Sequence, residues 1–441
     1  MANEFRSQFT VSPQVFRVSD EEKEILIHPR QGHGRKLLDQ VDNFQLIAKS
    51  QPIVGENRQW FGTVPYNRME RRENGDLLLY AKMPHEGEYT LYLTRNQLNG
   101  TPAPAEVMTF GVYALEDDLF AMRPWKGDFH IHSSESDGKE TPAFVMAASR
   151  RNGCDFMAVT DHMQYAPSLA AQAAARECGC DILVMPGEEV HLPDNAPHII
   201  NFGGRVSINT LAYQDEEKYR REAAEYAKGL PENMDPVDRF EIGASEWAFD
   251  RIREAGGISM FCHPYWQRQY HFYVDEAVID CLLARKKFDV LEVFGGFRRE
   301  DTEPNMLSLA RWQEERAKGK VIPAAGVSDG HGCDNHVANW YYTIVFAPKL
   351  EFPALAEAIR SDRSVAVHFI PGEHPILAGN FRLVKFTYFL FREFYPRHDE
   401  ICRLEGEIMR SYYSEGAIDA PEVIRSLSGS VSGFMGLFWE K

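Results

Sequence analysis

The residues with the clearest chemical potential are two histidines in the segment Asp128-Phe129-His130-Ile131-His132 and an aspartate at position 137. The segment predicts a strand that ends in a polar loop, and residues two apart on a strand point to the same face. His130 and His132 should therefore project together and could hold one cation, with the Asp137 carboxylate folded over the same pocket. The alternative is two ordinary histidines and a turn aspartate, since a His-x-His pair is short and common.

Further histidines and carboxylates follow predicted strands along the chain. They are Asp161 and His162 after residues 156–160, Glu188 and Glu189 after residues 182–185, His263 after residues 258–262, and Asp329 and His331 after residues 321–327. Because parallel strands of a barrel share one face at their C-terminal ends, we expect these side chains to converge. Buried imidazoles in such number are costly unless cations organise them, so the pattern predicts a metal centre.

Strand-like apolar runs alternate with amphipathic helices from residue 125 to about residue 370. One such helix is expected between Thr141-Pro142 and Asn152-Gly153, where Thr suits the N-cap, Pro the first turn and Gly the end. This alternation predicts an α/β fold, and about seven units predict a distorted (β/α)7 TIM-like barrel. Residues at about 205–245 interrupt the pattern and form an expected insertion over the site, or else a solvated helix without functional meaning.

The segments that flank the predicted barrel have other patterns. Residues 1–124 contain short alternating runs separated by turn residues such as Asn74-Gly75 and Glu86-Gly87, which predicts a β-rich N-terminal domain of the sandwich type. Residues 371–441 do not continue the alternation, and we expect a C-terminal extension that packs on the barrel of residues 125–370.

Composition limits the partners and the location that we expect. The 441 residues carry a net charge of −17, which argues against a nucleic-acid partner. No apolar run is long enough to cross a bilayer, and Met1–Arg6 lacks the apolar core of a signal peptide. The seven cysteines are scattered and odd in number. We therefore expect a cytoplasmic protein with a small-molecule substrate and no membrane partner, and the oligomeric state stays open.

Taken in order, the motifs resemble those of the PHP (polymerase and histidinol phosphatase) superfamily. They are His130-x-His132 with Asp137-Gly138, Thr160-Asp161-His162, Gly187-x-Glu189-Val190, His198, His263-Pro264 and Ser328-Asp329-x-His331. The resemblance covers about residues 125–370. The β-rich leader and the long insertion are also similar to members described as metallohydrolases of the CehA/McbA type. The resemblance implies the PHP fold and a metal-dependent hydrolase.

The resemblance also implies a cluster of two or three divalent metal ions of Zn, Mn or Fe. Carried over by position, the first ion would be held by His130, His132, Glu189 and Asp329, the second by Asp137, His162 and His331, and the third by Glu189, His198 and His263. Some members have histidine at the position of Asp137. A carboxylate there should favour a harder ion such as manganese or iron over zinc alone.

Residues beside these ligands have more than one interpretation. His191 could donate a proton or orient substrate as a catalytic residue, or it could be a plain loop histidine. Arg298 and Arg299 could clamp an anionic group of the substrate, or form a solvated pair. Glu188 should point away from Glu189 on an extended segment.

Three more carboxylates lie close to these positions in the sequence. Asp128 and Asp161 precede predicted ligands and suit a role in holding imidazole tautomers in place, while Asp161 could equally cap the next helix. Glu292 ends a strand at the right level to contact a ligand or a metal.

The favoured hypothesis is a phosphoesterase that hydrolyses a small phosphorylated molecule through a metal-activated water. The alternative keeps the metal and exchanges the substrate for a carboxylic ester, amide or carbamate, for which Phe294, Tyr265 and Trp266 could form an apolar wall. A second alternative is a non-catalytic metal-binding scaffold.

Overall fold

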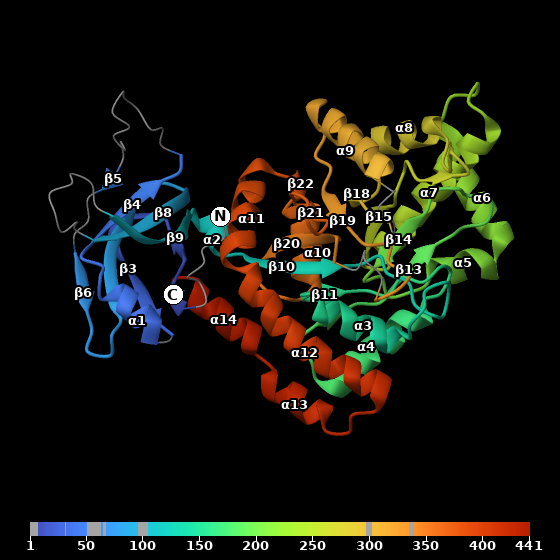
Figure 1. Ribbon diagram of the computed structural model, residues 1–441. Coiled ribbons are helices and arrows are strands. Elements are labelled where there is room, and N and C mark those ends of the chain that lie inside the picture. The colour runs from blue at the N-terminus through green and yellow to red at the C-terminus, as the bar shows by residue number, and fades with distance from the viewer. Residues whose placement is uncertain are drawn as a thin grey trace. The chain divides into compact units, whose positions relative to one another are not determined.

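The computed structural model describes residues 8–30, 32–50, 63–64, 68–95, 105–296, 302–334 and 339–441. The chain divides into two compact units (Figure 1). Unit 1 comprises residues up to Met122 together with Lys385–His398 and Gly429–Lys441, and unit 2 comprises Arg123–Val384 and Asp399–Ser428. The C-terminal region is thus shared between both units.

Unit 1 contains two β-sheets that share one hydrophobic core. The strands of the first sheet, in spatial order, are β1 (Phe9–Ser12), β3 (Ser19–Pro29), β7 (Leu77–Met83) and β6 (Met69–Arg71). Those of the second are β2 (Val15–Arg17), β9 (Ala105–Leu115), β8 (Gly87–Arg95), β4 (Asn43–Ala48) and β5 (Thr63–Val64). Ile25 and Leu79 of the first sheet belong to the same buried cluster as Leu91 and Val112 of the second. This is a sandwich-like arrangement, with short helices α1 (Gly32–Leu38) and α2 (Asp117–Phe120) and the longer α14 (Ser430–Phe438) in the same unit.

Unit 2 contains the remaining strands in two larger sheets and one hairpin. The six-stranded sheet has the order β12 (Leu183–Val184), β11 (Phe156–Met157), β10 (Arg123–Asp128), β20 (Tyr341–Ala347), β21 (Ser364–His368) and β22 (Ile376–Gly379). The five-stranded sheet has the order β13 (Gly187–Val190), β14 (Ile199–Phe202), β15 (Ile258–Phe261), β18 (Val290–Phe294) and β19 (Ala324–Gly326). The hairpin pairs β16 (Gln267–Arg268) with β17 (His271–Phe272).

The α/β class is confirmed. The distorted (β/α)7 TIM-like barrel stays a prediction, and isolated parallel bridges join the two sheets at two places, Ile131 with Gly330 and His162 with Glu189. Among the described residues, hydrogen-bonded strands of unit 2 form separate sheets, and β14 and β20 run antiparallel to both of their neighbours. Only eight loop residues, 191–198, join β13 to β14, and so short a connection without a helix returns the chain antiparallel. The two sheets meet near β13, where the Glu189 amide donates to the Asp161 carbonyl and the Met163 amide donates to the Glu189 carbonyl.

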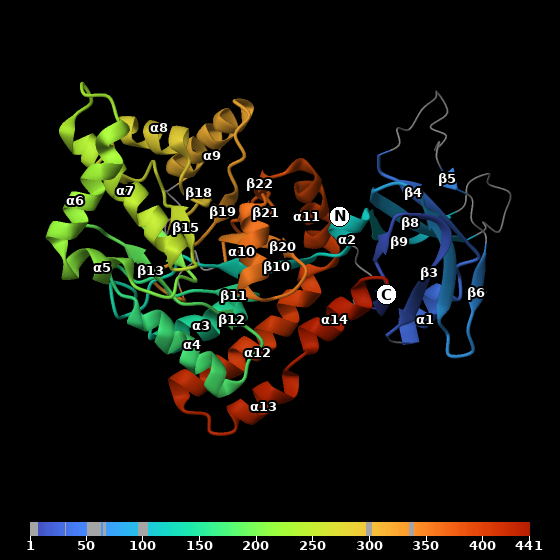
Figure 2. The same ribbon diagram turned by 180° about the vertical axis from the view of Figure 1, so that it is seen from behind.

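The helices of unit 2 cover these sheets (Figure 2). They are α3 (Pro142–Arg151), α4 (Ala166–Cys178), α5 (Ile208–Gln214), α6 (Glu216–Tyr226), the 3-10 turn Ala227–Gly229, α7 (Pro236–Glu254), α8 (Glu276–Arg285), α9 (Thr302–Ala317), α10 (Phe352–Arg360) and α13 (Ala420–Leu427). Helices α11 (Phe381–Glu393) and α12 (Tyr395–Glu415) have residues in both units.

Helix caps explain two of these boundaries. The Thr141 hydroxyl accepts from the Phe144 amide, which confirms the expected start of α3. Helix α7 begins at Pro236, inside the expected insertion of about residues 205–245, because the Asp235 carboxylate accepts from the Val237 amide. Among the described residues we find no helix with the length and apolarity needed to span a bilayer. The cytoplasmic location stays a prediction.

Candidate metal centre

The structure brings the nine side chains predicted as metal ligands together in unit 2, at the ends of its strands. They are His130, His132, Asp137, His162, Glu189, His198, His263, Asp329 and His331. Six of them follow strands of the two sheets, Glu189 lies in β13, His198 immediately precedes β14, and the loop after β10 supplies Asp137.

The first group surrounds the buried imidazoles of the His-x-His pair. Asp329 Oδ1 lies 3.0 Å from His132 Nε2 and 3.2 Å from His130 Nε2. Glu189 Oε2 lies 3.5 Å from His132 Nε2 and 3.6 Å from His130 Nε2. Two imidazole nitrogens thus face two carboxylates.

The second group is the open side of the centre. Asp137 Oδ2 lies 3.3 Å from His331 Nε2 and 3.5 Å from His162 Nε2, while Asp137 Oδ1 lies 3.7 Å from His132 Nδ1. His132 therefore faces both groups, with one ring nitrogen toward each. Asp137 is exposed and both His162 and His331 are half-buried, so solvent reaches the centre here.

The third group shares Glu189 with the first. Glu189 Oε1 lies 2.9 Å from His198 Nδ1, which lies 2.9 Å from His263 Nε2. The other oxygen, Glu189 Oε2, lies 2.6 Å from His162 Nδ1. One fully buried carboxylate therefore contacts imidazoles of all three groups.

Buried polar atoms without a hydrogen-bond partner indicate which kind of ligand this cluster could bind. His130 Nε2, His132 Nδ1, both oxygens of Glu189, His263 Nδ1 and Glu292 Oε1 are buried and make no hydrogen bond with the described part of the chain. The close nitrogen–oxygen approaches around Glu189 thus lack hydrogen-bond geometry. A buried polar atom without a partner costs about 1–3 kcal/mol, and more when it is charged. Divalent ions that accept these lone pairs would remove that cost, so the residues fit a metal cluster.

The ionisation states of the carboxylates and of His198 suit metal ligands. Burial by itself would raise the pKa of Glu189, but the adjacent imidazoles of His198 and His130 hold that pKa well below its usual value. Burial likewise opposes ionisation of Asp329, and the neighbouring His130 and His132 hold its pKa well below the usual range. Burial lowers the pKa of His198 to about 4. Ionised carboxylates and a neutral imidazole are the forms that bind metal. Although burial acts in the opposite direction, the neighbouring carboxylates raise the pKa of His130 well above its usual value and that of His162 to about 9, so these rings would release a proton when an ion binds.

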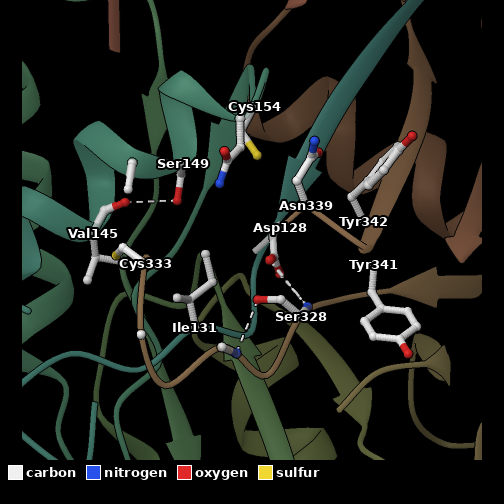
Figure 3. Close-up of a pocket in the computed structure, with 14 residues that line it drawn as sticks. Asp128, Ile131, Val145, Ser149, Cys154, Ser328, Cys333, Asn339, Tyr341 and Tyr342 are labelled. Atoms are coloured by element: carbon white, nitrogen blue, oxygen red, sulfur yellow. Dashed lines mark hydrogen bonds between the residues drawn. The ribbon is translucent and has the colours of Figure 1, made fainter. Parts of the chain in front are cut away.

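The Asp329 backbone is held in a conformation that favours glycine. Its φ is 48°, and strain of this kind persists only where the surroundings impose it. Asp128 provides one such restraint, because its carboxylate accepts from the amides of Ser328 and His130. Figure 3 shows Asp128 directed at Ser328 beside a cavity of about 30 Å³. Asp128 thus holds the backbone of two segments that carry ligands. The sequence had suggested that it would hold an imidazole tautomer instead.

Two further carboxylates hold loops rather than imidazoles. Asp161 accepts from the Ser133 amide and from the hydroxyls of Ser133 and Ser136, so it restrains the loop that carries Asp137. It does not cap α4. Glu188 points away from the centre and accepts from Ser207 and from the Ile208 amide at the start of α5.

The other candidates have mixed outcomes. His191 Nε2 lies 2.9 Å from His162 Nδ1 and 3.5 Å from Glu189 Oε1, at the half-buried edge of the cluster. Arg298 and Arg299 lie outside the described residues. Of the proposed apolar wall, Phe294 and Tyr265 are buried in the core. Trp266 lines a cavity of about 20 Å³ together with His263, Glu292 and Asp329.

The residue that sequence reasoning undervalued is Glu292 on β18. Its Oε2 lies 3.3 Å from His130 Nδ1 and its Oε1 lies 3.5 Å from His263 Nδ1. The sequence indicated only that Glu292 lies near the end of one of the predicted strands that carry the ligands. Nothing in the sequence pairs Glu292 with two particular imidazoles.

Comparisons with known proteins give structural similarities only. No protein-family model matches the chain, and the curated proteins give no match. A two-domain protein from Bacteroides vulgatus, described as containing a predicted PHP-like metal-dependent phosphoesterase, aligns over 62% of this chain and 71% of its own, with a TM-score of 0.43 and 18% identity.

Two other solved structures show weaker similarity. An amidohydrolase from Chromobacterium violaceum aligns over 47% of this chain and 87% of its own, with a TM-score of 0.32 and 20% identity. The lesion-specific endonuclease PfuEndoQ from Pyrococcus furiosus aligns over 54% of this chain and 56% of its own, with a TM-score of 0.30 and 15% identity.

The description of one structural neighbour thus names PHP, which is also the superfamily that the motifs resemble. All three TM-scores lie below 0.5, so the chemistry of the site is inferred below from its own residues. The predicted absence of a nucleic-acid partner stays a prediction.

Proposed function

We propose that this protein is a metal-dependent hydrolase whose centre holds two or three divalent ions of Zn, Mn or Fe. The observation that carries the proposal is the buried Glu189 carboxylate, which contacts imidazoles of three groups while both of its oxygens lack a hydrogen bond. A carboxylate in this position suits a ligand shared between ions. The predicted ligand set is retained in full, with His130, His132, Glu189 and Asp329 at the first ion.

The residues of the chain prepare this centre for hydrolysis. When bound, divalent ions lower the pKa of a water molecule and neutralise an anionic substrate. Burial of Glu189 and His130 keeps the local dielectric low, which strengthens every charge interaction at the site. The exposed Asp137 marks the side by which substrate enters. His191, half-buried at the same edge, is the proposed proton donor to the leaving group.

Charge favours a phosphate ester as the substrate. The proposed ligands include three carboxylates, on Asp137, Glu189 and Asp329, and Glu292 is a fourth within the cluster. Three divalent ions exceed the charge of all four and two ions balance it, so a centre loaded with three ions would be positive. A positive centre attracts a phosphate dianion more strongly than a neutral carboxylic ester, amide or carbamate. We therefore favour a phosphoesterase that acts on a small molecule.

Metal analysis paired with a substrate panel tests the proposal. We expect the purified protein to contain divalent ions and to hydrolyse nitrophenyl phosphate, with activity lost on chelation and restored by manganese or zinc. Activity on nitrophenyl acetate alone would refute the phosphoesterase and support a carboxylic ester hydrolase instead. A protein that binds ions yet hydrolyses no phosphoester or carboxylic ester would support the scaffold alternative.

A further inference from the structure

We infer that Glu292 is a positioning residue that orients two imidazoles of the centre at once, by accepting the Nδ1 proton of His130 with one oxygen and facing Nδ1 of His263 with the other. The inference rests on the proposed metal centre and adds to its predicted ligands. Glu292 lies on β18 and is 1% exposed. Its two oxygens face different histidines, Oε2 toward His130 Nδ1 at 3.3 Å and Oε1 toward His263 Nδ1 at 3.5 Å.

The opposite nitrogens of the same rings face the centre. His130 Nε2 lies 3.2 Å from Asp329 Oδ1, and His263 Nε2 lies 2.9 Å from His198 Nδ1. The two rings are stacked, with centroids 5.5 Å apart and an angle of 28° between their planes. One carboxylate placed behind both rings therefore fixes the tautomer that presents Nε2 to an ion in each case.

Other residues keep space for this carboxylate. A Cβ atom at Gly295 would lie 2.0 Å from Glu292 Oε1, so any side chain there would displace the carboxylate. Gly295 is itself held by the buried Asn305 of α9, whose Oδ1 accepts from the Gly295 amide at 2.9 Å and whose Nδ2 donates to the Gly295 carbonyl at 2.8 Å. A helix and a glycine thus fix the position of Glu292 relative to the two imidazoles.

A different role for Glu292 is that of a ligand to an additional ion. The side chains of His130, Cys262, His263 and Glu292 offer ligand atoms within 4.8 Å of one another. In that case, both imidazoles would bind metal through Nδ1 and Nε2 together, which requires each ring to lose its last N–H proton. Acceptance of that proton by Glu292 involves no such cost, so we favour the positioning role.

The experiment compares Glu292→Gln and Gly295→Ala with the wild type. The matched control is Glu188→Gln, which removes another buried glutamate, on β13, that points away from the centre. Long-range ¹H–¹⁵N NMR of the ion-free proteins, recorded at a pH where the rings are neutral, reports which nitrogen of each histidine carries the proton. Titration with Mn²⁺ and Zn²⁺ reports the number of ions bound and their affinity.

We expect both test variants to bind the wild-type number of ions at saturation, with affinity about 10–100-fold weaker. We also expect them to lose the single Nδ1–H tautomer at His130 and His263, and we expect the control to keep both properties. Fewer ions at saturation would make Glu292 a ligand and overturn the inference. Unchanged tautomers and affinity would also overturn it. If the wild type binds no ions, the proposed function fails, while the NMR measurement still decides how Glu292 acts on the two rings.

Discussion

Replacement of Glu189 by glutamine is the most informative perturbation of the centre. The two side chains have nearly the same volume, so the substitution leaves no cavity. It does remove the negative charge from a group that is 0% exposed and lies within 3.6 Å of ring nitrogens on His130, His132 and His198. The effect should therefore fall on ion binding and turnover, with the fold preserved.

The magnitude follows from the two oxygens of Glu189. Each faces a different part of the cluster, and a charged polar interaction is worth about 1.5–3 kcal/mol. Loss of two such interactions amounts to about 4 kcal/mol, which is about a 10³-fold loss in rate at 1.4 kcal/mol per tenfold. We expect kcat with nitrophenyl phosphate to fall by at least this factor, and metal analysis to find at least one ion fewer per chain.

The control for this experiment lies one residue away. Glu188 is equally buried and lies on the same strand, but its side chain accepts hydrogen bonds at the start of α5. We expect Glu188→Gln to keep its ions and most of its activity. A Glu189→Gln protein with the full number of ions and activity within tenfold of wild type would refute the proposed centre.

Three further predictions concern metal removal, pH and the proton donor. Chelation should lower the melting temperature measured by calorimetry, because an ion at 100 times its Kd stabilises the fold by about 2.7 kcal/mol; an unchanged melting temperature after complete ion removal would count against a buried centre. Burial raises the pKa of Glu241 from 4.5 to about 7, so the folded state holds this proton more tightly than the unfolded state and loses stability as the pH rises from 4.5 through 7. Glu241→Gln should therefore raise the free energy of unfolding at pH 8, by at most about 3 kcal/mol, and change it little at pH 4. Urea titrations at the two pH values measure this difference, and an equal change at both would contradict burial of a charged carboxylate as the cause. His191→Ala should lower kcat about 100-fold for an alkyl phosphate and much less for nitrophenyl phosphate, whose leaving group needs no proton; equal losses on both substrates, or loss of an ion, would make His191 a ligand instead.

The sequence by itself determined where chemistry is found along the chain. Period-two spacing places His130 and His132 on one face of the chain, and strand ends in an α/β fold carry the other candidates toward the same region. Local cap signals also located the start of α3, because Thr141 and Pro142 act on neighbours within one helical turn. Such features depend on residues that are close in sequence, so the sequence pattern of a single segment is enough to predict them.

Only the tertiary structure decided which groups face each other. Glu292 contacts His130, a residue 162 positions earlier, and Asp128 accepts from the Ser328 amide 200 positions later. The antiparallel placement of β20 likewise depends on its pairing with β10, which comes from a distant segment. Hydrogen bonds and charge contacts of this kind form only once packing has brought separate strands together, so their pairing is a property of the folded chain, and no local sequence pattern specifies it.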